Sequence, residues 1–297
     1  SVVSVLLTIL NRSFEISNKK SQRPFLVCLL VCLVWHPCAF MFILRFQLSI
    51  PLASSACNID CHKTRTSIKA STEIENRVFN GHSFGPEVHP YLVMFAIYHF
   101  KFPTVNLCSG SIISQRWIIS AAHCFPNTVI FTDITQDVGS ELRSIGVAKK
   151  GDIFAHPSFN QRSDYTYYNV ENDLALVKTA KRIVFDEFTK PIALATPGAM
   201  GQEATIAGYG KSENGSQSPL EGSVVINRCV LAPDSKVICS QSCAFAGSGD
   251  SGGALRTTDG LIGVISGHAS TNDVEETIYA DISLNFDWII EVLGDNA

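Results

Sequence analysis

Charged side chains are scarce in this chain of 297 residues, of which Asp, Glu, Lys and Arg make up only 17%. Soluble domains usually contain about 25% charged residues, whereas disordered chains combine high charge with few apolar groups. Because apolar residues make up 46% of the chain, the composition excludes a disordered chain and predicts a large hydrophobic core. The formal net charge of −4 gives no indication of the basic surface that binds nucleic acid.

Two common ligand-binding patterns are also absent. No C-x-x-C pair occurs among the cysteines, and although Cys57 and Cys61 are four positions apart, no matching Cys/His pair follows them. A structural zinc site is therefore not expected. No G-x-x-x-x-G-K-[ST] sequence occurs either, which argues against a phosphate-binding loop. The sequence thus implies no metal and no other cofactor.

The upstream segment, residues 1–56, contains the most apolar stretch of the chain, FLVCLLVCLVW at 25–35. Two interpretations stay open. In the preferred one, Met41 is the true start and residues 41–56 form a signal peptide that is removed. In the other, residues 25–53 form an uncleaved signal anchor with basic residues on its cytoplasmic side. Both predict export, as a secreted protein in the first case and as a membrane-anchored one in the second.

The rest of the chain consists of short apolar runs separated by Gly, Pro, Asn and Asp, such as YLVMFAIY (91–98) and GLIGVISG (260–267). Runs of this length at short spacing are typical of a β-barrel or β-sandwich. Only residues 286–293 place apolar side chains at helical spacing. We therefore expect one antiparallel β unit at 78–297, closed by a helix, and a polar linker or prosegment at 57–77.

Three short segments contain residues suited to acyl transfer. In A-A-H-C, His123 follows an apolar run, and an imidazole exchanges protons near neutral pH. In N-D-L-A-L, Asp173 heads a run in which its carboxylate can orient a histidine ring. In G-D-S-G-G, three glycines around Ser251 allow a tight turn, and the amides of Gly249 and Ser251 can form an oxyanion hole. Each segment alone is ordinary; their combination and order carry the prediction.

Together these segments resemble the chymotrypsin/trypsin family of serine endopeptidases, which has A-A-H-C, D-[IL]-A-L and G-D-S-G-G in this order. The resemblance covers residues 78–297. It implies an all-β fold of two packed antiparallel six-stranded β-barrels with a C-terminal α-helix. It also implies that Ser251 is the nucleophile, that His123 is the general base and that Asp173 orients the histidine.

The resemblance also implies two disulfides. Cys108 and Cys124 match the pair that braces the histidine loop, and Cys229 and Cys239 match a second pair. Three further cysteines outside the upstream segment have no assigned partner: Cys57, Cys61 and Cys243. A bridge from the prosegment to Cys243 is one option, but the sequence does not decide it.

The segment Arg77-Val78-Phe79-Asn80-Gly81 resembles the activation site of the family, R-[IV]-[IV]-x-G. Cleavage after Arg77 would release the amino group of Val78. In the family this group pairs with the aspartate before the nucleophile, here Asp250, and orders the oxyanion hole. The resemblance therefore implies a zymogen and a separate activating protease that cuts after a basic residue.

The expected specificity pocket departs from the trypsin pattern. Its floor is Phe245 by direct count, or Gln241 if an insertion shifts the count, and neither residue attracts Arg or Lys. His268 and Thr277 replace glycines at the pocket wall, and Ser266 begins the strand that would pair with substrate. We therefore expect cleavage after small or aliphatic residues rather than after basic ones.

The sequence thus predicts a secreted serine endopeptidase made as a zymogen, with protein or peptide substrates and protein inhibitors as its partners. No nucleic acid is expected, and nothing in the sequence indicates an oligomer. Asn214, in Asn-Gly-Ser, is a potential glycosylation site. The alternative is a non-catalytic homologue that binds extracellular partners, and the altered pocket is the only argument for it.

Overall fold

The computed structural model describes residues 78–100, 105–159, 170–198, 200–210, 218–231, 233–271 and 274–295. The predicted upstream segment, the predicted prosegment and Asn214 lie outside these residues. The predictions about the start of the protein, the anchor and glycosylation therefore stay predictions. Among the described residues, no helix has the length and apolar character needed to cross a membrane.

The first sheet contains seven antiparallel strands in the order β6-β5-β2-β3-β4-β8-β7. In several strands every second side chain is buried, as in β5, because one face of the strand packs on the core. The strands are β2 (Leu92–His99), β3 (Val105–Ile112), β4 (Trp117–Ser120), β5 (Val129–Asp137), β6 (Leu142–Lys149), β7 (Ile153–Ala155) and β8 (Ala175–Lys178).

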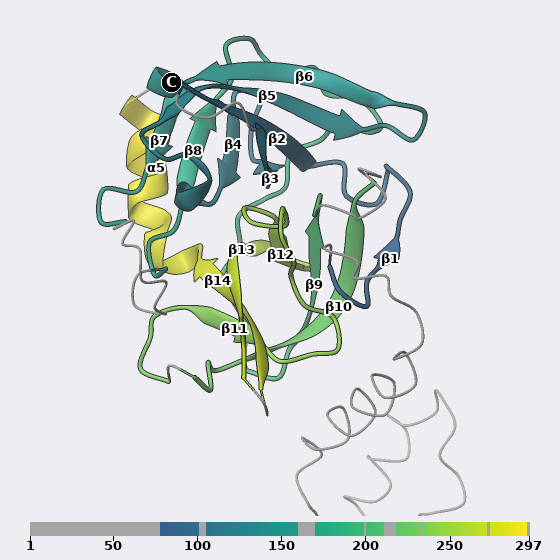
Figure 1. Ribbon diagram of the computed structural model, residues 1–297, viewed down its shortest axis with the longest axis vertical. Helices are drawn as coiled ribbons and strands as arrows, with labels where there is room; N and C mark the ends of the chain where they lie inside the picture. The colour runs from purple at the N-terminus through teal and green to yellow at the C-terminus, as the bar shows by residue number, and fades with distance from the viewer. Residues whose placement is uncertain are drawn as a thin grey trace, which may run out of the picture. The chain divides into compact units, whose positions relative to one another are not determined.

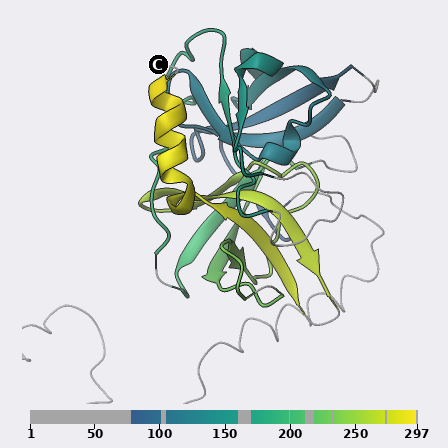
Figure 2. The same ribbon diagram turned by 90° about the vertical axis from the view of Figure 1, so that its left-hand side faces the viewer.

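The second sheet closes on itself. Because β9 pairs with both β12 and β10, six of its strands form a complete ring, and the two-residue strand β1 adds to the outer edge of β10. The strands are β1 (His82–Ser83), β9 (Glu203–Gly208), β10 (Leu220–Asn227), β11 (Ile238–Ser240), β12 (Ala254–Thr257), β13 (Gly260–Ser270) and β14 (Glu275–Asp281). The first sheet lies above the second in Figure 1 and Figure 2.

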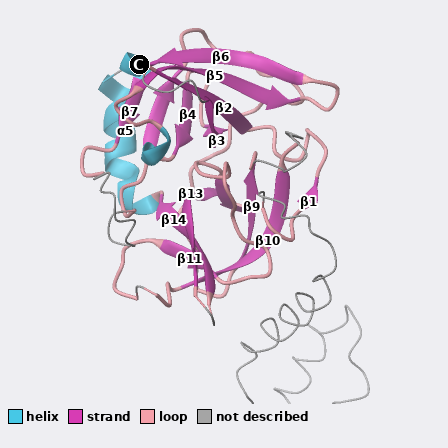
Figure 3. Ribbon diagram, in the orientation of Figure 1, coloured by secondary structure: helices cyan, strands magenta, loops and turns pink. Residues whose placement is uncertain are grey.

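The expected all-β, trypsin-like fold class is confirmed, with strands dominating the coloured ribbon of Figure 3. The strand count differs from the expected six and six. The second sheet contains a closed six-stranded barrel, whereas the first is a seven-stranded sheet whose end strands, β6 and β7, do not pair with each other. Strands β1 and β7 have only two and three residues. Strands this short leave no readable period in the sequence.

Helix α5 (Phe286–Asp295) follows β14 and returns to the first sheet, as the yellow ribbon in Figure 1 shows. Ile289 is fully buried, and the Trp288 ring lies 4.7 Å from the ring of His156 in an edge-on contact. The main core cluster joins residues of both sheets, for example Ile119 of β4 and Val264 of β13. This shared core fixes the loops of one sheet against the loops of the other.

Strand β5 offers a matched test of what holds the first sheet together. Ile134 is fully buried, whereas Ile130 in the same strand is 48% exposed. We expect Ile134→Ala to lower the free energy of unfolding by about 2–5 kcal/mol, because it removes buried methyl groups and leaves a cavity. Ile130→Ala loses the same strand propensity and should cost less than about 1 kcal/mol. Urea unfolding measures both changes, and equal losses would contradict this view of the core.

Candidate active site

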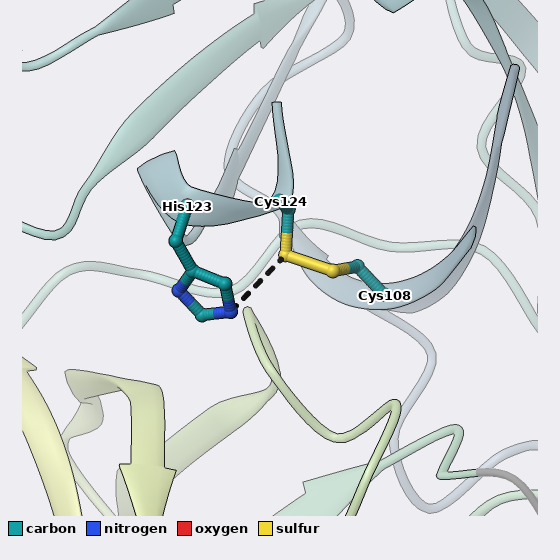
Figure 4. Close-up of side chains that lie close together, drawn as sticks. All are labelled: Cys108, His123 and Cys124. Atoms are coloured by element: carbon teal, nitrogen blue, oxygen red, sulfur yellow. Dashed lines mark hydrogen bonds between the residues drawn. A yellow bond between two sulfur atoms is a disulfide. The ribbon is translucent and has the colours of Figure 1, made fainter. Parts of the chain in front are cut away.

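His123 lies in a single 3₁₀ turn, Ala122–Cys124, which directly follows β4. A disulfide between Cys108 of β3 and Cys124 ties this turn to the first sheet (Figure 4). The imidazole is 13% exposed, so it is mostly enclosed by protein but still reaches the surface. The turn and the disulfide together fix the position from which the ring extends.

The three side chains in Figure 4 place their ligand-type atoms within 4.8 Å of one another. Metal ions bind cysteine as the thiolate, but Cys108 and Cys124 are joined in a disulfide, so this group does not form a metal centre. The sulfur of Cys124 lies 4.0 Å from Nε2 of His123 and 3.8 Å from the carbonyl oxygen of Ser251. The disulfide therefore lies directly beside both residues.

Asp173 lies two residues before the start of β8 and is fully buried. Its Oδ1 accepts the backbone N–H of His123 at 2.8 Å, and its Oδ2 lies 2.6 Å from Nδ1 of the same histidine. The hydroxyl of Ser266, in β13, donates to Oδ2 at 2.5 Å. Because an ionised carboxylate only accepts hydrogen bonds, Nδ1 carries the hydrogen, and the lone pair of a neutral ring is on Nε2.

The same contacts set the protonation of the histidine. Burial alone would lower the pKa of His123, because it disfavours the charged ring. The negative charge of Asp173 and its hydrogen bond to the ring outweigh that effect and raise the pKa of His123 above its ordinary value. The imidazolium form is therefore stabilised at this position.

Ser251 lies in the loop between β11 and β12, at the face where the two sheets meet. Its carbonyl oxygen accepts the N–H of Ser109 from β3 at 2.7 Å. The next residue, Gly252, has φ +82°, and a Cβ there would lie 2.1 Å from the hydroxyl oxygen of Ser120. Only glycine fits this position, because both the backbone conformation and the close approach of the first sheet exclude a side chain.

Two backbone amides of this loop have no hydrogen-bond acceptor in the part of the chain that the structure describes. Gly249, with φ +94°, and Ser251 donate their N–H groups to no acceptor among the described residues. Asp250 between them is fully buried, and its carboxylate accepts the N–H groups of Gly210 at 2.8 Å and of Gly247 at 2.9 Å. Val78 is also buried, at 1% exposure, whereas Arg77 lies outside the described residues.

A cavity of about 330 Å³ opens beside Ser251. Its lining combines apolar, small and aromatic residues: Phe79, Ala246, Gly247, Ser248, Ser251, Ile265, Gly267 and His268. No lining residue has an acidic side chain. The cavity is therefore suited to an uncharged side chain.

The residues expected at the pocket are only partly at this cavity. His268 lines it, whereas Phe245 stacks between the rings of Phe79 and His268 instead of forming an open floor. Ser266 and Thr277 are buried and engaged elsewhere, Ser266 with Asp173 and Thr277 with the N–H of Ala246 at 3.0 Å. Of the residues expected at the pocket, His268 is the one that is among the residues lining this cavity.

The alternative floor residue, Gln241, is also engaged away from the cavity. Its side-chain amide donates to the carboxylate of the fully buried Glu276 at 2.9 Å, and it is not among the residues that line the cavity. Phe79, the second residue after the predicted activation bond, was not expected at the pocket at all.

The cysteines outside the histidine loop are also bonded. Cys229 pairs with Cys239, which gives both disulfides expected from the sequence. Cys243 is disulfide-bonded as well, and its partner is outside the described residues. Cys57 and Cys61 are outside them too, so the bridge from the prosegment to Cys243 stays a prediction.

Comparison with known proteins places the chain in a family. The sequence model of the trypsin family, described as "Trypsin", matches residues 78–289. The chain belongs to the trypsin family. Members of this family are serine proteases that act on protein or peptide substrates.

Curated relatives in the trypsin family cover most of the chain. Trypsin epsilon of Drosophila erecta is 27% identical over 234 residues, or 73% of this chain and 88% of that protein. Phenoloxidase-activating enzyme 1 of Spodoptera litura is 27% identical over 259 residues, or 74% of this chain and 68% of that protein. Identity at this level over most of the chain agrees with a shared fold.

Solved structures show the same fold. Neuropsin, a serine protease expressed in the limbic system of mouse brain, matches with a TM-score of 0.59 and 22% identity, covering 72% of this chain and 98% of that chain. A structure titled HL collagenase matches with a TM-score of 0.57 and 23% identity, covering 73% and 99%. The likeness extends over nearly the whole of both structures.

The raised pKa of His123 is directly measurable by NMR titration of its ring. We expect a midpoint above the ordinary value of about 6.5. Asp173→Asn removes the charge that favours the imidazolium, leaves burial as the main effect, and should lower the midpoint. His156, whose pKa burial lowers, serves as the control and should not respond to Asp173→Asn. If Asp173→Asn leaves the titration midpoint of His123 unchanged, the charge of Asp173 does not raise the pKa of this histidine.

Proposed function

We propose that this protein is a serine endopeptidase that hydrolyses peptide bonds through an acyl-enzyme, with Ser251, His123 and Asp173 as its catalytic triad. The observation that carries the proposal is the buried carboxylate of Asp173, which contacts both the backbone and the ring of His123. It holds the histidine with a proton on Nδ1 and leaves Nε2 to exchange protons with Ser251 and the substrate.

In the proposed reaction, Oγ of Ser251 attacks the substrate carbonyl carbon while Nε2 of His123 takes the hydroxyl proton. The negatively charged oxygen of the tetrahedral intermediate accepts hydrogen bonds from the backbone N–H groups of Gly249 and Ser251. Among the described residues, neither of these N–H groups has another acceptor. Collapse breaks the C–N bond, and His123 gives its proton to the leaving amine. In the second half of the reaction, water attacks the acyl-enzyme while His123 takes its proton. The ester bond then breaks, the acid is released, and His123 returns the proton to Ser251.

The proposal includes activation by cleavage after Arg77. Val78 is buried in a core cluster with residues of the second sheet, and Asp250 is buried between the two proposed oxyanion amides. The carboxylate of Asp250 accepts the N–H groups of Gly210 and Gly247, and a nearby cation would stabilise such a buried, hydrogen-bonded charge further. A freed amino group at Val78 would supply a positive charge to this region. Secretion after removal of a signal peptide belongs to the same proposal.

The proposed substrates carry an uncharged side chain before the scissile bond. The lining of the cavity beside Ser251 offers no carboxylate to pair with Arg or Lys. Strand β13 extends beyond the end of β12, so its segment from Ser266 onward pairs only with β14 among the described strands. An extended peptide can add to this open edge and place its side chain in the cavity.

Hydrolysis of an unbiased peptide mixture by the chain cleaved after Arg77 tests this function. We expect cuts after uncharged residues, and Ser251→Ala should reduce the rate about 10⁶-fold. Ser144→Ala, which changes an exposed serine in β6 that does not line the cavity, is the matched control and should retain activity. Undiminished hydrolysis by Ser251→Ala, or none by the wild type, would overturn the proposal and favour the non-catalytic alternative.

The activation step has a separate test. Arg77→Gln should block cleavage by an activating protease that cuts after basic residues, and the uncleaved chain should stay inactive on the same peptides. Supplying the identical variant as a chain that begins at Val78 should restore activity, because nothing downstream has changed. Full activity of uncleaved Arg77→Gln would show that no zymogen switch exists.

A further inference from the structure

Three aromatic rings form a continuous stack next to Ser251. The ring of Phe79 lies on that of Phe245, with centroids 4.5 Å apart and planes inclined by 17°. The other face of Phe245 stacks on the ring of His268, at 4.7 Å and 21°. These distances and angles are those of stacked aromatic pairs. The two outer rings, Phe79 and His268, line the cavity.

The backbone holds Phe79 in this position. Its N–H donates to the carbonyl of Phe245 at 2.8 Å, and the N–H of Phe245 donates back to the carbonyl of Phe79 at 3.3 Å. On one side of Phe79 the side chain of Val78 is buried. On the other, the side-chain amide of Asn80 donates to the carbonyl of Cys243 at 2.8 Å. The backbone at Phe79 is therefore held by its own hydrogen bonds and by the contacts of the residues before and after it.

The lining of the cavity also includes a position that carries no side chain, Gly267. A Cβ added at Gly267 would meet no atom within 4 Å, so this part of β13 leaves room for a substrate side chain. Ile265 adds an apolar surface next to it. The lining thus combines the Phe79 ring, which occupies space, with a glycine that leaves space free.

We infer that Phe79 is a specificity-determining residue, whose ring forms a wall of the pocket for the substrate side chain before the scissile bond and restricts that side chain to small, uncharged groups. The inference rests on the proposed function. It also means that the segment directly after the activation bond contributes a side chain to substrate selection.

The test compares two peptide amides that differ only in the residue before the scissile bond, Val in one and Phe in the other. Within one enzyme preparation, the ratio of their kcat/KM values does not depend on the fraction of active enzyme. Removing the ring in Phe79→Ala should widen the cavity and raise the Phe/Val ratio at least about tenfold. Gly267→Ala adds a methyl group to the lining of the same cavity and should lower the same ratio.

Two further variants complete the experiment. Phe79→Leu keeps an apolar side chain and should raise the ratio less than Phe79→Ala, which covers the case in which Phe79→Ala does not fold. Phe131→Ala is the matched control, because the Phe131 ring is stacked on Tyr98 at 4.5 Å and 13° within the first sheet. Loss of this ring should leave the ratio unchanged.

An unchanged ratio in both Phe79 variants, with an active wild type, would overturn the inference and leave the proposed function standing. An equal rise of the Phe/Val ratio in Phe131→Ala would also overturn the inference, because loss of any stacked ring, and not the position of Phe79 at the cavity, would then explain the change. A wild type that hydrolyses neither peptide would remove the proposed function and the inference with it.

Discussion

The buried carboxylate of Asp173 is the contact on which the site depends. A charge this deep is tolerated only when it is paired and hydrogen-bonded. Its partners come from both sheets, the backbone and ring of His123 from the first and the hydroxyl of Ser266 from the second. Any shift of one sheet against the other would break one of these bonds. The stability of the junction and the orientation of the histidine therefore have the same physical cause.

The loop of Ser251 obeys a steric constraint at the same junction. Gly252 leaves space for the hydroxyl of Ser120, and Ser109 binds the carbonyl of Ser251. The disulfide between Cys108 and Cys124 links β3 to the turn that contains His123. The glycines of G-D-S-G-G thus serve the packing of the two sheets, and the direction of the backbone amides follows from that packing.

Much of this could be predicted from the sequence, because each motif is local and its residue types have few alternative uses. The fold class and the two disulfides follow from spacing and resemblance. The first sheet has seven strands because Ile153–Ala155 pairs with β8 over three residues, too few to show a period. The pocket was the weakest part, since Thr277 and Ser266 turn inward to hydrogen bonds that counting cannot reveal. The sequence did mark Phe79 as unusual, because the activation pattern of the family has an aliphatic residue at that position and this chain has an aromatic one.

Covalent labelling by a fluorophosphonate, located by mass spectrometry, tests the account most directly, because only a serine activated by a neighbouring base reacts readily with such a probe. For the chain cleaved after Arg77, the account predicts one adduct per molecule, on Ser251, and its loss in both Ser251→Ala and the unfolded protein. An intact, folded chain with Val78 at its N-terminus that takes up no label, or takes it up on another serine, would contradict the assignment of the triad.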